Sequence, residues 1–214
     1  MKMTAGLSIL AAGALMFLFS ASQASAQART RPRATAPGAG AVKQAAGKEG
    51  AVILKMEATG QNALARTPKF QNNAAEPPAQ ARKWARISVN YKTGVEWTDE
   101  LEFRYLVLVK HPKTGAFTTF SATVNYVDIP KGKQHISTVF LRPNTLGRYG
   151  AVEWAGVKIY LRGKDAPVAV AQMPKNELRP WTIEYKIKEN VLLNRDQTPF
   201  ALVAIDNYET IKPK

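Results

Sequence analysis

Hydrophobic and polar side chains alternate with a period of two in several stretches of the second half of the chain. In the segment 86–91, RISVNY, the apolar residues Ile87, Val89 and Tyr91 fall on one side and polar residues on the other. This alternation predicts a half-buried β-strand. One further segment, 101–110, is apolar on both faces at its centre and predicts an interior strand. The strands predicted on these patterns are 86–91, 101–110, 118–127 and 183–188.

Shorter apolar runs add further candidate strands, and no amphipathic stretch is long enough to predict a helix. The additional strands are expected at 134–141, 152–161, 167–172 and 199–205. Many short strands separated by turn residues are typical of sandwiches and barrels. We therefore predict an all-β fold, an antiparallel immunoglobulin-like β-sandwich. A small β-barrel of the OB type is the alternative.

Turn residues separate three consecutive strands of this pattern. The sequence HPKTG at 111–115 places Pro112 at the first turn position and Gly115 where a hairpin loop with a bulge requires a left-handed residue. The sequence IPKGK at 129–133 is a second turn of this kind. The two turns predict a meander of three strands.

The N-terminal part of the chain differs from the rest in composition and in hydrophobic pattern. An apolar run from Gly6 to Phe19 ends before Ala24-Ser25-Ala26, which is typical of a signal peptide cleaved after residue 26. Such a run is too short for a comfortable membrane span, so the mature chain is expected to have none. Residues 27–81 are rich in Ala, Gly and Pro and predict a flexible basic arm, with a short strand or one helical turn at 51–57. The sandwich domain is expected at 82–214.

The chain is strongly basic, with a formal net charge of +14. The excess is spread over arm and domain, since residues 27–81 hold 8 basic and 3 acidic residues and residues 82–214 hold 21 and 13. A basic surface favours polyanions such as nucleic acid, lipopolysaccharide and acidic glycans. The candidate contacts are Arg29, Arg31, Arg33, Lys131 and Lys133.

The motifs of familiar enzymes are missing from the sequence. It contains no Cys, no H-E-x-x-H, no G-x-S-x-G and no P-loop. The triplet KTG occurs at 92–94 and 113–115, but its nucleophilic Ser-x-x-Lys partner is absent, so both triplets are interpreted as turns. His111 and His135 have no metal-ligand spacing, and the carboxylates of EWTDELE at 96–102 lack the glycine of a Ca²⁺ loop. The sequence thus predicts no cofactor, no metal and no enzyme activity.

Aromatic residues next to basic ones raise the question of nucleic-acid binding, in which bases stack on exposed rings. Phe103, Tyr105 and Tyr185 fall on the apolar faces of their predicted strands. Trp84, Trp154 and Trp181 are likewise interpreted as core or core-edge residues. Nucleic acid is therefore disfavoured as a partner.

The exported leader, the basic Ala/Gly/Pro arm and a cysteine-free domain opening KWARISVNYKTGVEWTDELEFRYLVLVKHPKTGAF resemble a type of secreted protein of Verrucomicrobia. Some of these proteins are encoded beside type IV pilus genes and have an immunoglobulin-like sandwich. The resemblance implies a role in pilus-associated or cell-surface interactions and no known catalysis. It transfers no functional residues.

Together these features predict an exported, non-enzymatic interaction or assembly protein located in the periplasm, on the outer surface or outside the cell. Its partners would be envelope or pilus proteins, with a homo-oligomer and an anionic surface as further options. A polyanion-binding module is the alternative function. An envelope hydrolase with an unfamiliar pair of carboxylates is the rival from the enzyme class.

Overall fold

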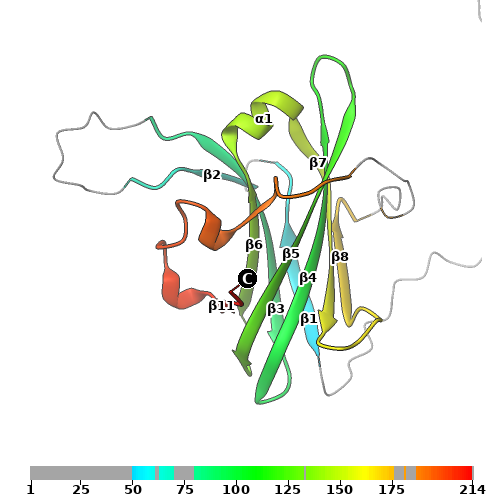
Figure 1. The fold of residues 1–214 in the computed structure, drawn as a ribbon, viewed down its shortest axis with the longest axis vertical. Helices are drawn as coiled ribbons and strands as arrows, with labels where there is room; N and C mark the ends of the chain where they lie inside the picture. The colour runs from blue at the N-terminus through cyan, green and yellow to red at the C-terminus, as the bar shows by residue number, and fades with distance from the viewer. Residues whose placement is uncertain are drawn as a thin grey trace, which may run out of the picture. The chain divides into compact units, whose positions relative to one another are not determined.

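Two β-sheets make up the described part of the chain (Figure 1). The computed structural model describes residues 50–60, 63–69, 80–132, 134–175, 181 and 187–213. The first sheet contains β1 (Ala51–Glu57), β2 (Leu64–Arg66), β3 (Lys83–Thr93), β6 (His135–Leu141) and β10 (Leu193–Asn194). The second contains β4 (Trp97–Lys110), β5 (Phe117–Pro130), β7 (Ala151–Leu161), β8 (Ala169–Met173), β9 (Ile187–Lys188) and β11 (Thr210–Ile211).

The order of the strands is that of an immunoglobulin-like sandwich, which confirms the predicted fold class. The main path of the first sheet is β1-β3-β6-β10, and that of the second is β11-β5-β4-β7-β8. The chain crosses between the sheets after β3, after β5 and after β6, so that neighbours in sequence often lie in opposite layers. All the pairs are antiparallel except β5 with β9, which is parallel. The sheets face each other and do not close into the barrel considered as the alternative.

The core lies between the two sheets and is built from the period-two positions of the long strands. From the first sheet, Ile87, Val89 and Tyr91 are fully buried, as their alternation predicts. From the second sheet, Phe103 and Tyr126 meet them, and the ring of Phe103 lies 5.0 Å from that of Tyr91. Burial of large aromatic and β-branched side chains is the main stabilising contribution in a chain without disulfides.

The predicted hairpin at 111–115 is confirmed, whereas the predicted meander is wrong. β4 and β5 pair along their length, and Gly115 has a φ of 67° in the turn between them. β6, however, leaves β5 and pairs with β3 in the other sheet. A turn sequence reverses the chain but does not determine which sheet the next strand joins. β6 is buried on both faces, which suits the middle of the first sheet.

The C-terminal segment also differs from the pattern. Residues 199–205 were expected to form a strand, but they form turns, and Ala204 has left-handed geometry. Ile187 was expected on a buried face and is 50% exposed. Of the strand predicted at 183–188, only 187–188 lies within the described residues. A short helix that no pattern predicted, α1 (Pro143–Tyr149), begins at a proline and connects β6 to β7.

Two strands lie before residue 82, where the sequence places the start of the domain. Residues 51–57 form β1, which pairs with β3 over most of its length, and Ala51 and Met56 are buried in the core. β2 pairs with the beginning of β3. The residues of the predicted signal peptide, 1–26, lie outside the described residues. Among the described residues, none forms a helix with the length and apolar character needed to cross a bilayer.

Candidate functional site

The outer edge of β5 is only partly covered, and we call residues 121–125 the open edge. β9 pairs with β5 at Thr119 and Phe120, and β11 pairs with it at Tyr126 and Val127. The N–H of Lys212 donates to the carbonyl of Asn125 (2.8 Å), so the main-chain groups of Asn125 face away from β4. Residues two apart in a strand face the same way, and Thr123 at the centre therefore presents its N–H and C=O outward. Within the described residues, Thr123 pairs with no strand on this side.

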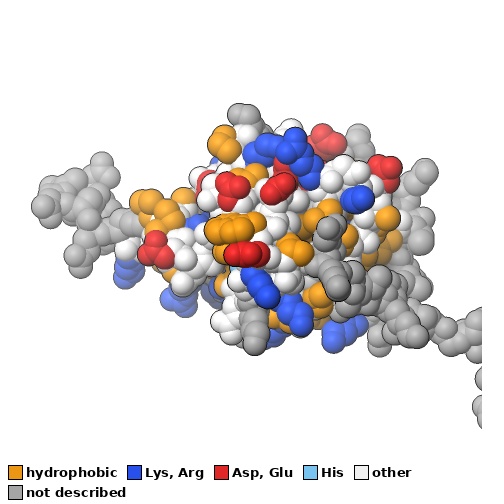
Figure 2. All heavy atoms as spheres, turned by 90° about the horizontal axis from the view of Figure 1, so that it is seen from below, with side chains coloured by type: hydrophobic (Ala, Val, Ile, Leu, Met, Phe, Trp, Pro, Cys, Tyr) orange, Lys and Arg blue, Asp and Glu red, His pale blue; other side chains and the backbone are white. Residues whose placement is uncertain are grey.

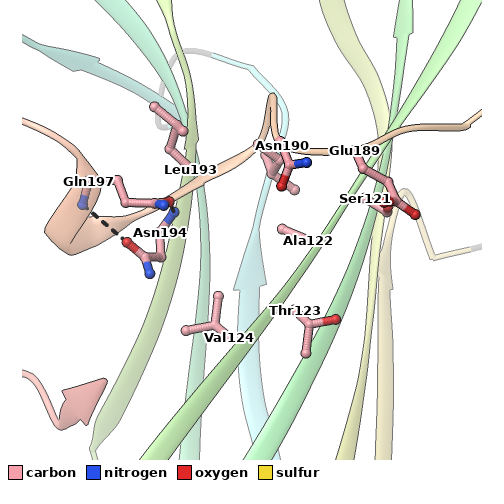
Figure 3. A pocket seen from close by; sticks show the side chains of 10 residues that line it. Ser121, Ala122, Thr123, Val124, Glu189, Asn190, Leu193, Asn194 and Gln197 are labelled. Atoms are coloured by element: carbon pink, nitrogen blue, oxygen red, sulfur yellow. Dashed lines mark hydrogen bonds between the residues drawn. The ribbon is translucent and has the colours of Figure 1, made fainter. Parts of the chain in front are cut away.

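A groove of ≈ 260 Å³ lies along the open edge (Figure 3). Its floor comes from Ser121–Val124 of β5, and its other wall comes from the segment 189–197. The carboxamides of Asn190, Asn194 and Gln197 line it, together with Glu189. Asn194 and Gln197 also cap each other's backbone at the 3₁₀ helix η2 (Arg195–Gln197). A narrow groove with unpaired strand groups on one side and amides on the other suits an extended polypeptide.

Three exposed apolar side chains lie in the loop that follows the groove wall in the chain, and we call Leu202, Val203 and Ile205 the apolar knob. They are 70%, 42% and 54% exposed, whereas most large apolar residues of the sandwich are buried. Ile205 begins a second 3₁₀ helix, η3 (Ile205–Asn207). In the view from below, hydrophobic side chains gather on the left, the side on which Figure 1 places this segment (Figure 2). Exposed apolar side chains that lie together mark an interaction surface.

The apolar knob is held in shape by one buried arginine. The side chain of Arg195 donates to the carbonyls of Phe200, Ala201 and Val203, and the distances to Phe200 and Val203 are both 3.3 Å. Its guanidinium also lies 4.1 Å from the centre of the Tyr208 ring. Arg195 is only 5% exposed. A rigid fork of donors that bonds successive carbonyls fixes the loop before any partner arrives.

A hydrogen bond and an ion pair fasten β11, which pairs with β5 at Tyr126 and Val127, beside the open edge. His135 Nδ1 lies 2.6 Å from Glu209 Oε1, and the Lys212 ammonium lies 2.8 Å from Glu100 Oε2. The hydrogen bond from Lys212 is the main cause that lowers the pKa of Glu100, and Asn125 adds a second donor. His135 is buried and its other nitrogen lies 3.2 Å from Thr93 Oγ1. The C-terminal strand is thus fixed to both sheets by polar contacts.

One of the five predicted polyanion contacts, Lys131, lies within the described residues. Lys131 is exposed in the turn after β5, and its N–H donates to the carbonyl of Glu96. Arg29, Arg31, Arg33 and Lys133 lie outside the described residues. The roles assigned to these five residues therefore stay predictions.

The histidines and the acidic segment take part in local structure. His111 Nδ1 accepts from the N–H groups of Lys113 and Thr114, which stabilises the hairpin turn. In β4, Glu102 pairs with Arg104, and Glu100 binds Lys212 as described. Within the described ranges, no group of three or more His, Asp or Glu side chains is arranged to hold a metal ion. We therefore assign no metal-binding role to these described residues.

Sequence reasoning missed both the open edge and the apolar knob. The period-two pattern of 118–127 identifies β5 but not its place at the edge of a sheet. The apolar run at 199–205 was a visible signal, but it was interpreted as a strand. The signal that could have identified this run as a loop is Arg195, which lies just before it. A cation at that position can bond several carbonyls of a loop.

Comparisons with known proteins support a bacterial family. One family model matches residues 45–214, and the family is associated with pili and the bacterial surface. A crystal structure of a protein from Akkermansia muciniphila, a verrucomicrobial bacterium, aligns with a TM-score of 0.63 and 22% identity. The alignment covers 77% of this chain and 93% of the other and shows the shared fold. No curated protein matches the chain. The resemblance noted from the sequence is supported at the level of the family.

Proposed function

The chain belongs to this family of pilus-associated bacterial surface proteins, and we propose that it is an exported, non-enzymatic assembly protein that binds an extended segment of another envelope protein. The single observation that carries the proposal is the open edge of β5 with its groove. Two features suit an added strand: the main-chain groups of Thr123, which pair with no further strand among the described residues, and a wall of carboxamides opposite them.

The chemistry of strand addition fits the shape of this site. The incoming main chain would bond to Thr123 and its neighbours, which supplies affinity without regard to sequence. Selectivity would come from side chains that reach the apolar knob. Because Arg195 fixes the knob in advance, little conformational entropy is lost when a partner packs against it.

The enzyme alternative has less support than partner binding. An acid–base hydrolase requires two carboxyl groups about 5 to 10 Å apart on either side of a pocket. Among the described residues, Glu189 is the one carboxylate that lines the groove along β5, beside carboxamides and hydroxyls. Partner binding accounts for the groove and the knob together, whereas hydrolysis accounts for neither.

Substitution at the centre of the open edge tests the proposal. Thr123→Pro removes the outward N–H, while the bonds between β5 and β4 are made by other residues and stay intact. Thr123→Ala is the matched control, because it keeps that N–H. A photo-crosslinking residue at Ser121 of the full chain, incubated with envelope extract, should label the same protein in the parent and the Thr123→Ala variant. In Thr123→Pro we expect the labelling to fall about tenfold.

Two results would contradict the proposal. Equal labelling in the Thr123→Pro and Thr123→Ala variants would show that strand addition is not the binding mode. A crosslinker placed at Thr114, in the hairpin that precedes β5, reports non-specific labelling. If Thr114 labels the same protein as strongly as Ser121 does, the groove is not the binding site.

A further inference from the structure

Basic side chains that are distant in sequence gather at the end of the sandwich from which β2 projects. The described segments 63–69, 80–86 and 141–148 contain seven basic residues and no Asp or Glu. The strand pairing places these segments side by side, since β3 pairs with β2 on one side and with β6 on the other. We call the following set the basic face: Arg66, Lys69, Arg82, Lys83, Arg86, Arg142 and Arg148.

Repulsion between the basic side chains of this face lowers the stability of the domain unless an anion is bound. Arg66 lies directly opposite Lys83 in the pairing of β2 with β3. Like charges directly opposite in a sheet repel each other. Within the described residues, neither Arg66, Lys83 nor Arg142 forms an ion pair with a carboxylate, whereas Arg86 is 3.7 Å from Glu57. The described residues therefore leave most of the positive charge of this face uncompensated.

A groove of ≈ 340 Å³ crosses the basic face. Arg82 and Arg142 line it, and its remaining surface is mostly apolar, from Trp84, Pro143 and Pro199. Arg82 is oriented by Asn144, whose Oδ1 accepts from its Nη2 at 2.7 Å. The groove thus combines an apolar floor with arginines at its sides.

We infer that the basic face binds an acidic polysaccharide. The flat apolar floor suits the carbon faces of sugar rings, and guanidinium groups pair with carboxylate or sulfate groups in two-point geometry. Single-stranded nucleic acid would need exposed aromatic rings for its bases. Trp84 and Phe140 are only 7% and 2% exposed, so neither ring offers a full face on which a base could stack. This site is separate from the open edge, so it goes beyond the proposed strand binding.

Three matched triple variants of the full chain test the inference, with heparin as the probe. The basic-face variant carries Arg66→Ala, Lys83→Ala and Arg142→Ala. The turn variant replaces three exposed lysines elsewhere, Lys92, Lys113 and Lys164, and so loses the same net charge. The arm variant replaces Arg29, Arg31 and Arg33.

We expect the basic-face variant to bind heparin about tenfold more weakly than the turn variant at moderate salt, and its affinity to fall less steeply as salt rises. Circular dichroism of each variant confirms that the sandwich is intact. Equal affinities for the basic-face and turn variants would overturn the inference, because binding would then follow net charge alone. Loss confined to the arm variant would overturn it as well. Tighter binding of single-stranded DNA than of heparin would identify a nucleic-acid site instead.

Discussion

At the scale of single residues, Arg195 links the interior to the candidate interface. It is a buried cation whose compensation comes from carbonyl oxygens and an aromatic ring. Charged groups in such positions are stabilised only while every donor is bonded. Its bonds all reach one loop, so the cation determines the shape of the apolar knob.

We predict that Arg195→Ala lowers the free energy of unfolding by about 2 to 4 kcal/mol, since the carbonyls of Phe200, Ala201 and Val203 lose a charged donor. Urea denaturation measures this loss. Hydrogen exchange should speed up at residues 199–207 and stay unchanged in β7, which does not touch the loop. Arg195→Lys keeps the charge but cannot bond three carbonyls, so we expect intermediate stability and a mobile loop. Unchanged exchange in both variants would mean that the loop holds its own shape.

At the scale of elements, the junction between α1 and β7 depends on a glycine. Gly150 has a φ of 101°, and a Cβ at this position would stand well inside van der Waals contact with the carbonyl oxygen of Lys110. Gly147, one turn earlier in α1, has nothing within 4 Å of such a Cβ. A side chain at Gly150 would therefore clash with the backbone, whereas a side chain at Gly147 has room.

Alanine at these two positions should act in opposite directions. We expect Gly150→Ala to lower the free energy of unfolding by about 2 to 4 kcal/mol through clash and backbone strain. Gly147→Ala should raise it by about 0.5 to 1 kcal/mol, because alanine is the better helix former. Thermal unfolding of both variants gives the comparison. Similar effects of the same sign would contradict the geometry described for the end of α1.

The elements that could be predicted from the sequence are those with a strong period of two. Strands β3 and β5 follow the alternation because one face of each is buried and the other is polar, and β4 is apolar on both faces at its centre because it lies inside its sheet. The order of the strands could not be predicted, because a turn such as 129–133 is compatible with a hairpin or a crossing. The loop at 199–205 was misassigned because its structure depends on a distant contact with Arg195, which outweighs local β propensity.

The candidate site was less accessible to sequence reasoning than the fold. An open edge depends on which strands lie beside β5, and β9 and β11 are only two residues long in the described chain. The basic face was hidden for the same reason, since its three segments become neighbours only through pairing. Proximity in sequence drew attention instead to Arg29, Arg31 and Arg33.

At the scale of the whole molecule, three tyrosines bind the two sheets into one unit. Burial raises the pKa of Tyr126 to about 12 and raises the pKa values of Tyr91 and Tyr105 well above the ordinary value near 10. The Tyr105 hydroxyl bonds to Ser137 of the opposite sheet at 2.6 Å. These side chains are neutral in the folded state, so the fold resists their ionisation.

Because the folded state disfavours ionisation of these tyrosines, the free energy of unfolding should depend on pH. A group whose folded pKa is raised contributes stability below its unfolded pKa and loses it as the pH rises toward the folded pKa. We therefore expect the free energy of unfolding to be steady up to about pH 9 and to fall above about pH 10. Absorbance of tyrosinate and near-ultraviolet circular dichroism should change together. Tyr105→Phe should shift the transition to higher pH, and full ionisation while the dichroism persists would refute the prediction.

The placement of β1 and β11 has a mechanical consequence. Ala51 pairs with Thr93, and Thr210 pairs with Val127, so both strands approach the same end of the sandwich. Thr93 Oγ1 donates to the carbonyl of Pro130 there. β1 packs near β8, whereas β11 lies at the opposite edge of the second sheet. A force that pulls β1 and β11 apart would act perpendicular to the strands. Their hydrogen bonds would then break one after another and not all at once. We therefore expect the domain to yield at low tension when it is pulled between β1 and β11.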